Sequence, residues 1–397
     1  MAKKTIKNII IYVISPIHVI SSLSAVKSRH GDEPISISII VHWPGVASQI
    51  AEELGRVVKN ITRNFSLIES INVVPQSDLD KILSLPDPGK SIDNLKGIVG
   101  NIDVHEIYYA HDVVGRLYQA FCAAYPKARR ICFGDGMGNV YEKEVHLSYL
   151  FPQEEKQISA GNRIKEKIRQ ILCPNNHPGT SDKSYRPHEA ALILPVDQSG
   201  HFLKNIPLTI PQKDTVLDLL NKCVISADDL QGYIKDLMNK FRGRNKYLLL
   251  TDNFAEGNFI DFDREIEMWR WIIETHCKPG GVVFIKSHPG ETLPRNENIK
   301  ECLKEKYEVY ELKEEFKRYP IEFWKELLQS STVICMSYPV LSLKYLYNIN
   351  VIQPMDDAFV ERWFPEWTWR SYKNSIELYM VPHKRLDAWD GKSLLYP

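Results

Sequence analysis

Short runs of consecutive apolar residues alternate along the chain with segments whose apolar residues recur every three or four positions. In the first half, the continuous runs predict buried β-strands at residues 9–15, 35–43, 68–74, 106–110, 130–133 and 190–195. The helical periodicity predicts helices at residues 18–29, 46–61 and 113–125. Continuous apolar strands that alternate with helices are typical of a parallel sheet covered on both faces.

The second half repeats this alternation after a polar stretch at residues 152–187 and a proline-containing connection at residues 206–212. Ser226, with Asp229 three residues later, predicts the start of a helix that runs to about Phe241. Strands are expected at residues 247–251, 282–286, 308–312, 332–336 and 350–353, and the helices between them begin near Arg264, Asn296, Ile321 and Val340. We therefore expect an α/β protein of two doubly wound, Rossmann-like domains, residues 1–205 and 206–397, which face a central cleft.

Charge and cysteine content narrow the classes of function. The 397 residues contain 50 Lys and Arg and 50 Asp and Glu, so no net field attracts nucleic acid or an anionic membrane. No apolar stretch approaches the ~20 residues that span a bilayer. The seven scattered cysteines are typical of a reduced, cytoplasmic protein. No CxxC, HExxH or other metal-ligand spacing is present, so no metal and no cofactor are expected.

The end of the predicted strand 130–133 carries the first candidate for chemistry. Asp135 lies between Gly134 and Gly136, where the backbone can approach a ligand closely. A carboxylate at this position can take a proton from an attacking hydroxyl, which makes Asp135 a candidate catalytic base. Taken alone, an ordinary Asp-Gly turn is the better interpretation.

The end of strand 282–286 carries the second candidate. His288 follows Lys286 and precedes Pro289, and an imidazole there can hydrogen-bond or protonate a phosphate oxygen while the lysine adds positive charge. The alternative is a strand-end turn with a surface histidine. His177-Pro178-Gly179 repeats the same tripeptide in a polar stretch without a preceding strand, and we assign that copy no role.

The third candidate is the turn from strand 332–336 into the next helix. Ser337, Tyr338 and Pro339 open this helix, and the free N–H groups of a helix N-terminus together with the Ser337 hydroxyl form an anion site. Simple capping of the helix by Ser337 is the competing interpretation.

Four further positions are weaker candidates. Asn253 follows strand 247–251, where it either lines the donor side of the expected cleft or belongs to a solvated turn. Backbone groups at Gln353 can reach the base of a nucleotide. Ser15 and His18 follow the first strand and are candidates for acceptor contacts, although a histidine at a helix start is the better interpretation of His18. A tryptophan-rich segment at residues 363–372 is either a core seam or a surface for a membrane.

Taken in order, these motifs resemble those of the bacterial sialyltransferases and polysialyltransferases. That group has an acidic-Gly motif in its first domain, a His-Pro motif in its second, and a serine-bearing strand-to-helix turn after it; the counterparts are Asp135-Gly136, His288-Pro289 and Ser337. The Ser15-Pro16 loop is also similar. The sequence departs from the group at Gly134, where a second acidic residue is usual, and at Tyr338, where a second small hydroxyl residue is frequent.

The resemblance implies a GT-B fold and an inverting, metal-independent transfer of sialic acid from CMP-sialic acid, which is a co-substrate, to the hydroxyl of a capsular or lipooligosaccharide glycan. Asp135 would be the base, and His288 and Ser337 would hold the CMP phosphate. A cytoplasmic enzyme with peripheral contact to the inner membrane would fit such an acceptor. Two alternatives stay open: a CMP-Kdo transferase and a non-catalytic glycan- or nucleotide-binding protein on the same fold. A retaining enzyme with a diphosphate-sugar donor is disfavoured because residues 327–357 contain no Glu.

Overall fold

The computed structural model describes residues 6–44, 48–110, 116–133, 187–194, 206–337 and 339–388. The chain divides into two compact units. The N-terminal unit comprises Met1–Lys59, Phe65–Ile193 and Gln198–Gln212, and the C-terminal unit comprises Asn60–Asn64, Leu194–Asp197 and Lys213–Pro397. The predicted boundary between residues 205 and 206 and the predicted cleft stay predictions.

The N-terminal unit is built on one parallel sheet with the strand order β3-β2-β1-β4-β5-β6-β7. Its strands are β1 (Lys7–Val13), β2 (Ile35–Val41), β3 (Ile68–Val73), β4 (Glu106–Tyr109), β5 (Arg129–Cys132), β6 (Glu189–Ala191) and β7 (Leu208–Thr209). The order reverses between β1 and β4, because the chain grows from β1 toward β3 and then returns to the other side of β1. Ligands of doubly wound sheets bind at the carboxyl ends of strands beside such a switch point.

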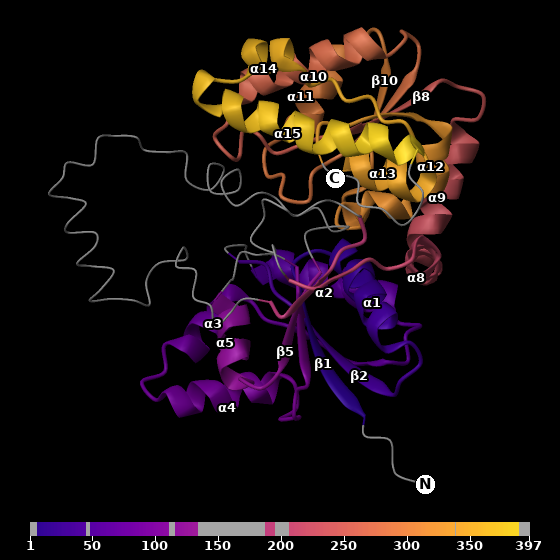
Figure 1. Ribbon diagram of the computed structural model, residues 1–397. Helices are drawn as coiled ribbons and strands as arrows, with labels where there is room; N and C mark the ends of the chain where they lie inside the picture. The colour runs from indigo at the N-terminus through magenta and orange to yellow at the C-terminus, as the bar shows by residue number, and fades with distance from the viewer. Residues whose placement is uncertain are drawn as a thin grey trace, which may run out of the picture. The chain divides into compact units, whose positions relative to one another are not determined.

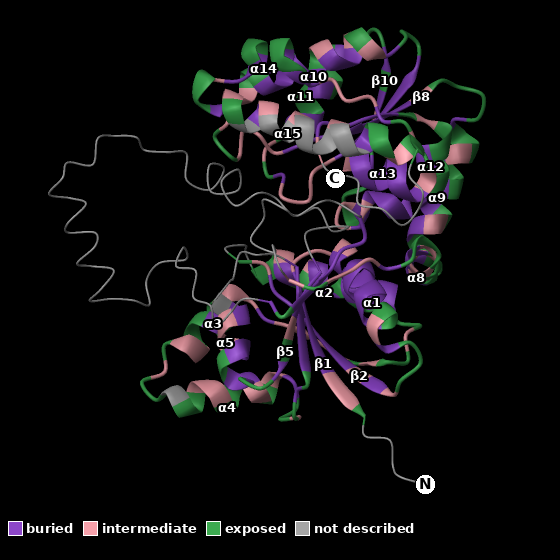
Figure 2. Cartoon of the chain, in the orientation of Figure 1, coloured by how far each residue is buried: buried purple, intermediate pink, exposed green. Residues whose placement is uncertain are grey.

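Helices cover both faces of this sheet. The helices are α1 (Ile17–His30), α2 (Ser48–Thr62), α3 (Gln76–Leu83), α4 (Pro88–Ile98) and α5 (Arg116–Ala124). One face of the sheet, with Ile10 and Tyr12 of β1, packs against buried residues of α3, α4 and α5. The strands are mostly buried in Figure 2, and Figure 1 shows α4 and α5 on the opposite side of the strands from α1.

Residues on adjacent strands of the N-terminal unit form a buried ionic network at the amino ends of the strands. Glu106 begins β4 and pairs with Arg29 at 3.1 Å and with His30 at 2.9 Å. Glu189 begins β6 and pairs with Arg29 and with Arg129, the first residue of β5. This network lies at the edge opposite to the one that carries ligands in such sheets, so we assign it to stability.

The C-terminal unit contains a second parallel sheet with the order β10-β9-β8-β11. The strands are β8 (Lys246–Leu250), β9 (Val282–Lys286), β10 (Glu308–Glu311) and β11 (Thr332–Ile334). The helices are α8 (Lys213–Ser226), α9 (Asp228–Lys240), α10 (Phe262–His276), α11 (Arg295–Leu303), α12 (Lys325–Ser330), α13 (Pro339–Tyr347), α14 (Asp357–Trp363) and α15 (Glu366–Arg385), with short 3-10 turns η2 (Glu314–Phe316), η3 (Ile321–Phe323) and η4 (Leu386–Ala388). Here the order reverses between β8 and β11.

The fold class predicted from the sequence is confirmed: the protein is α/β, and each unit is a parallel, Rossmann-like sheet with helices. Nearly every predicted strand is present, and its observed ends lie within two residues of the predicted ends. The strand predicted at 190–195 is shorter, because β6 ends at Ala191.

Two predictions about the second half of the chain are wrong, and several observed elements were not predicted, among them β7 within the predicted connection at residues 206–212. Ser226 does not cap α9: it is the last residue of α8, and its hydroxyl donates to the Lys222 carbonyl at 3.0 Å. The residue before α9 is Ala227, whose side chain makes no capping hydrogen bond. The strand predicted at 350–353 is reduced to a single bridge between Ile352 and Ile334. Helices α3, α4 and α8 were not predicted.

Within the described part of the chain, every helix is too short or too polar to cross a bilayer.

Candidate functional site

The switch point of the C-terminal sheet brings three predicted strand ends to one edge. Because β8 lies between β9 and β11, the residues that follow these strands are neighbours although they are far apart in sequence. Asp252 and Asn253 follow β8, His288 follows β9 and Ser337 follows β11. Two of the three motifs found in the sequence therefore meet on either side of the end of β8.

Gly290 shows how closely His288 and Asn253 approach each other. A Cβ atom placed on this glycine would lie 3.3 Å from His288 Nδ1 and 3.4 Å from Asn253 Nδ2. Distances of this size are tight van der Waals contacts, so the glycine backbone fills the space between the two side chains. Asn253, predicted as a weaker candidate, therefore shares the edge of the sheet with His288.

The protonation state of His288 follows from its surroundings. Its Nδ1 accepts a hydrogen bond from the Gly290 N–H at 3.0 Å, so the proton of the neutral ring is on Nε2. Burial, together with the positive charges of Lys286 and Arg295, lowers the pKa of His288 to about 4. At neutral pH His288 is therefore a neutral donor through Nε2–H, and of the two roles that the sequence suggested this favours hydrogen bonding over protonation of a phosphate oxygen.

The loop that carries His288 is anchored by a buried arginine. Arg295, at the start of α11, is fully buried and pairs with Glu256 at 2.5 Å, Glu265 at 3.0 Å and Glu291 at 2.6 Å. Burial raises the pKa of Glu265 and of Glu291, and the charge of Arg295 opposes this rise. Removal of the guanidinium would leave these carboxyls in the interior without a counter-charge.

The backbone of the same loop is held by three further hydrogen bonds. Glu256 Oε1 accepts from the N–H groups of Thr292, at 3.0 Å, and Leu293, at 3.3 Å. Lys317 Nζ donates to the Glu291 carbonyl at 3.0 Å. Side chains from outside the loop therefore fix the path of the backbone directly after His288.

Lys286 lies deeper than the sequence suggested. This residue is 6% exposed, and its Nζ donates to the Lys317 carbonyl at 3.0 Å beside the ring of Trp324. Burial lowers the pKa of Lys286 to about 8, and the nearby Lys317 adds to the effect. Lys286 therefore acts on His288 through its field, while its ammonium group is held by a backbone carbonyl.

Asp252 is the residue at this edge that the sequence did not single out. Burial raises its pKa to about 7, and the neighbouring Ser337 side chain opposes the rise. The Ser337 hydroxyl also lies 3.6 Å from Cys335 Sγ. The only signal in the sequence was the run Thr251-Asp252-Asn253 after a strand, which is also typical of a turn.

Ser337 lies two residues before Pro339, the first residue of α13, so the predicted strand-to-helix turn is present. Tyr338 lies outside the described residues. Gln353 supports the same turn, because its Nε2 donates to the Met336 carbonyl at 3.1 Å and its Oε1 accepts from the Met355 N–H at 2.9 Å. Gln353 therefore holds the backbone beside Ser337.

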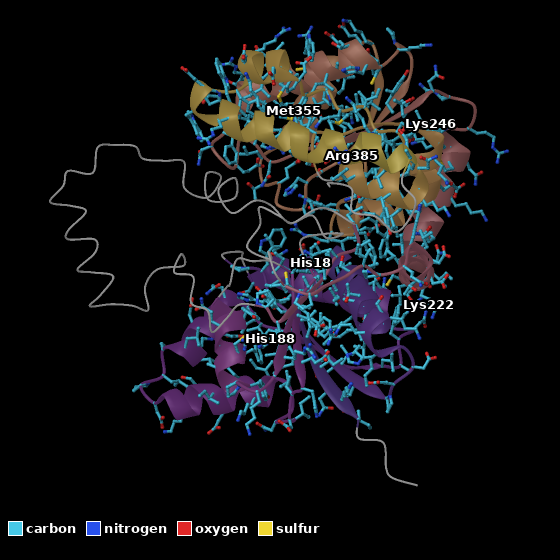
Figure 3. All side chains as sticks on the ribbon, in the orientation of Figure 1. His18, His188, Lys222, Lys246, Met355 and Arg385 are labelled. Atoms are coloured by element: carbon cyan, nitrogen blue, oxygen red, sulfur yellow. The ribbon has the colours of Figure 1, made fainter. Side chains whose placement is uncertain are left out.

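The candidates in the N-terminal unit are only partly described. Asp135, with Gly134 and Gly136, lies outside the described residues. Ser15 follows β1 at the switch point, and its carbonyl accepts from the His18 N–H at 3.0 Å. His18, labelled at the start of α1 in Figure 3, is 1% exposed, and its ring meets Phe133 edge-on at 5.6 Å. Its ring packs in the core below the end of β5.

The fold was compared with known proteins. No family model matches the sequence, and no curated protein matches it either. Solved structures do. S. aureus MnaA in complex with UDP has a TM-score of 0.53 at 13% identity, over 98% of this chain and 93% of that one. UDP-GlcNAc 2-epimerase from Neisseria meningitidis, bound to UDP-GlcNAc, has a TM-score of 0.50 at 12% identity, over 98% and 96%.

A 2,6-sialyltransferase from Photobacterium, in a complex with CMP and lactose, has a TM-score of 0.47 at 11% identity, over 98% of this chain and 78% of that one. The two structures with TM-scores of 0.53 and 0.50, together with the two parallel, Rossmann-like sheets, give the chain a GT-B fold. At identities this low, structural similarity shows the fold alone, and the substrate has to be inferred from the residues of the site.

We predict that Arg295→Met destabilises the protein by about 3–5 kcal/mol, because it leaves buried carboxylates without their cation. The matched control is Arg270→Met, which should cost about 1 kcal/mol or less, because within the described part of the chain Arg270 pairs only with Glu274, at 3.5 Å on the surface. Guanidinium unfolding of both variants measures the difference. Adding Glu265→Gln and Glu291→Gln to Arg295→Met should restore part of the loss. Equal costs for the two arginines would contradict the anchoring role.

Proposed function

We propose that this protein is an inverting glycosyltransferase that moves sialic acid, or a related nonulosonate, from a CMP-activated donor to a glycan hydroxyl. The observation that carries the proposal is the meeting of His288, Asn253 and Ser337 around the end of β8, at the switch point of the C-terminal sheet. The order of the Asp135-Gly136, His288-Pro289 and Ser337 motifs, which resembles the sialyltransferase group, adds to it.

In this proposal the donor phosphate lies between His288 and the start of α13. The Nε2–H of His288 donates to one phosphate oxygen, and the Ser337 hydroxyl and the first N–H groups of α13 donate to others. The rigid loop around Arg295 places the imidazole before the donor arrives. Such preorganised donors stabilise the charge that develops on the leaving phosphate.

The reaction then needs one base. The acceptor hydroxyl attacks the anomeric carbon of the sialic acid, the bond from that carbon to the phosphate oxygen breaks, and CMP leaves with the electron pair. Asp135 takes the proton of the attacking hydroxyl. CMP carries a single phosphate, whose charge hydrogen-bond donors can stabilise, so we propose that the transfer is independent of metal.

The acceptor follows from the same resemblance. We propose a capsular or lipooligosaccharide-type glycan, reached from the cytoplasmic face of the inner membrane. Trp367, which is 52% exposed near the start of α15, is the one exposed tryptophan of the described chain that could support a peripheral contact.

We expect the protein to release CMP from CMP-sialic acid only when a glycan acceptor is present, and to do so equally well in excess EDTA. The measurement is CMP release with CMP-sialic acid, CMP-Kdo and UDP-GlcNAc in parallel. Preference for CMP-Kdo would change the assigned donor from CMP-sialic acid to CMP-Kdo and leave the reaction, with CMP as leaving group, unchanged. CMP binding without turnover would favour the non-catalytic alternative, and exclusive use of UDP-GlcNAc would refute the proposal.

We expect Asp135→Asn to reduce turnover by about two orders of magnitude or more, because the amide cannot accept the acceptor proton. The affinity for CMP should stay nearly unchanged, since the base contacts the acceptor rather than the nucleotide. Steady-state rates and calorimetric CMP binding measure the two effects. If Asp135→Asn turns over normally, another carboxylate is the base, and Asp112 and Glu142 are next to be tested.

We expect His288→Ala to weaken CMP binding about 10- to 100-fold, the loss of one hydrogen bond to a charged group. His288→Gln, whose amide offers an N–H in place of Nε2–H, should restore much of the binding. The matched control is His276→Ala at the end of α10, where the chain enters the amino end of β9, at the opposite edge of the sheet. If His276→Ala weakens binding as much as His288→Ala, the strand-end assignment is wrong.

A further inference from the structure

Asp252 combines burial with an unused hydrogen-bonding atom. It lies two residues after the end of β8, at the switch point, and is 8% exposed. Its Oδ2 is buried and has no hydrogen-bond partner among the described residues. A buried carboxylate oxygen without a partner is costly, so its presence at the ligand edge of the sheet calls for an explanation.

Among the described residues, the cation that faces this carboxyl already has other partners. The charged and titratable groups that face it are Glu265 from α10, Arg295 from α11 and Cys335 after β11. Arg295 is already shared by three glutamates, and Glu265 repels a negative charge on Asp252. Burial therefore raises the pKa of Asp252 to about 7, so the acid and its carboxylate are both present at neutral pH.

The protonation state of Asp252 decides what Ser337 can do. A serine hydroxyl has a single hydrogen to donate. When Asp252 is ionised, it accepts only, so the Ser337 hydrogen is directed to the carboxylate and a phosphate faces both an oxygen lone pair and a negative charge. When Asp252 is protonated, its O–H donates to Ser337 Oγ, and the serine hydrogen is available to the ligand.

We propose that Asp252 is a positioning residue that, in its protonated form, turns the Ser337 hydroxyl toward the phosphate of the donor, so that donor binding takes up one proton. This inference rests on the proposed function, in which Ser337 contacts that phosphate. The proton comes from solvent and binds Asp252, and no other bond is made or broken. Asp252 then acts through Ser337 and does not itself contact the reacting atoms.

The test uses the 5′-methyl phosphate ester of cytidine as the probe. Like the donor, this phosphodiester keeps one negative charge across the neutral range, whereas the second pKa of a phosphate monoester is about 6 and would add its own titration. We expect calorimetric affinity for the intact wild-type protein to weaken about tenfold from pH 6 to pH 8. Binding at pH 8 in buffers of different ionisation enthalpy should take up about one proton.

Three variants separate the parts of the proposal. Asp252→Asn should bind with the wild-type affinity of pH 6 across the range, because its amide N–H donates to Ser337 Oγ at every pH. Ser337→Ala should bind more weakly and without the pH dependence. Asp236→Asn, the same change at an exposed position of α9, should titrate like the wild type. Any pH dependence left in Asp252→Asn above pH 8 reports Lys286, whose pKa is about 8.

The outcomes distinguish this inference from the proposed function. If the wild-type affinity is flat from pH 6 to pH 8 while Ser337→Ala binds weakly, Ser337 contacts the phosphate and the role of Asp252 is refuted. The same holds if Asp252→Asn keeps the wild-type pH dependence. If the probe binds the wild type at no pH while UDP does bind, the proposed function itself has failed, and with it the basis of this inference.

Discussion

The C-terminal site depends on one buried ionic contact, that of Arg295 with Glu256, Glu265 and Glu291. The four charges belong to four different segments: Glu256 to the turn after β8, Glu265 to helix α10, Glu291 to the loop after His288 and Arg295 to helix α11. Breaking such a contact exposes the remaining charges to an apolar interior, which costs far more than the intact network gains. The loop therefore has one favoured path, and the imidazole of His288 is placed before any ligand binds.

The two units carry their buried ionic networks at opposite edges of their sheets. In the N-terminal unit the buried network of Arg29, Glu106 and Glu189 closes the amino ends of the strands. The carboxyl ends carry Ser15 and Phe133, and the glycines and the aspartate follow in the sequence. In the C-terminal unit the ionic network lies at the carboxyl edge instead, where it holds the loop that carries His288. The same chemistry thus stabilises a fold in one unit and positions a side chain in the other.

The sequence was sufficient for the strands and for the positions of His288 and Ser337, because both depend on local patterns. A run such as Val282–Lys286 can only be a buried strand in a doubly wound protein, and whatever follows it must lie at the carboxyl edge. Asp252 was missed because its importance depends on strand order: nothing local shows that β8 and β11 are adjacent. Arg295 was missed for a similar reason, since its three partners are distant in the chain.

Local signals also failed where tertiary structure overrode them. Ser226 has the pattern of a helix cap, but it continues the preceding helix α8 and donates to a carbonyl within it. Residues 350–353 have the apolar character of a strand, but they pair with β11 only at Ile352, because they lie at the end of the sheet where the chain turns toward α14.

The contact of Gly290 with both His288 and Asn253 has a consequence for how this site can evolve. Any side chain at position 290 would press on the imidazole and on the amide together, at 3.3 and 3.4 Å. A substitution there would shift two side chains of the candidate site at once, and a second change would be needed to restore either one. Asn253, His288 and Gly290 can therefore change only together, so single substitutions that alter specificity must occur at other positions of the site.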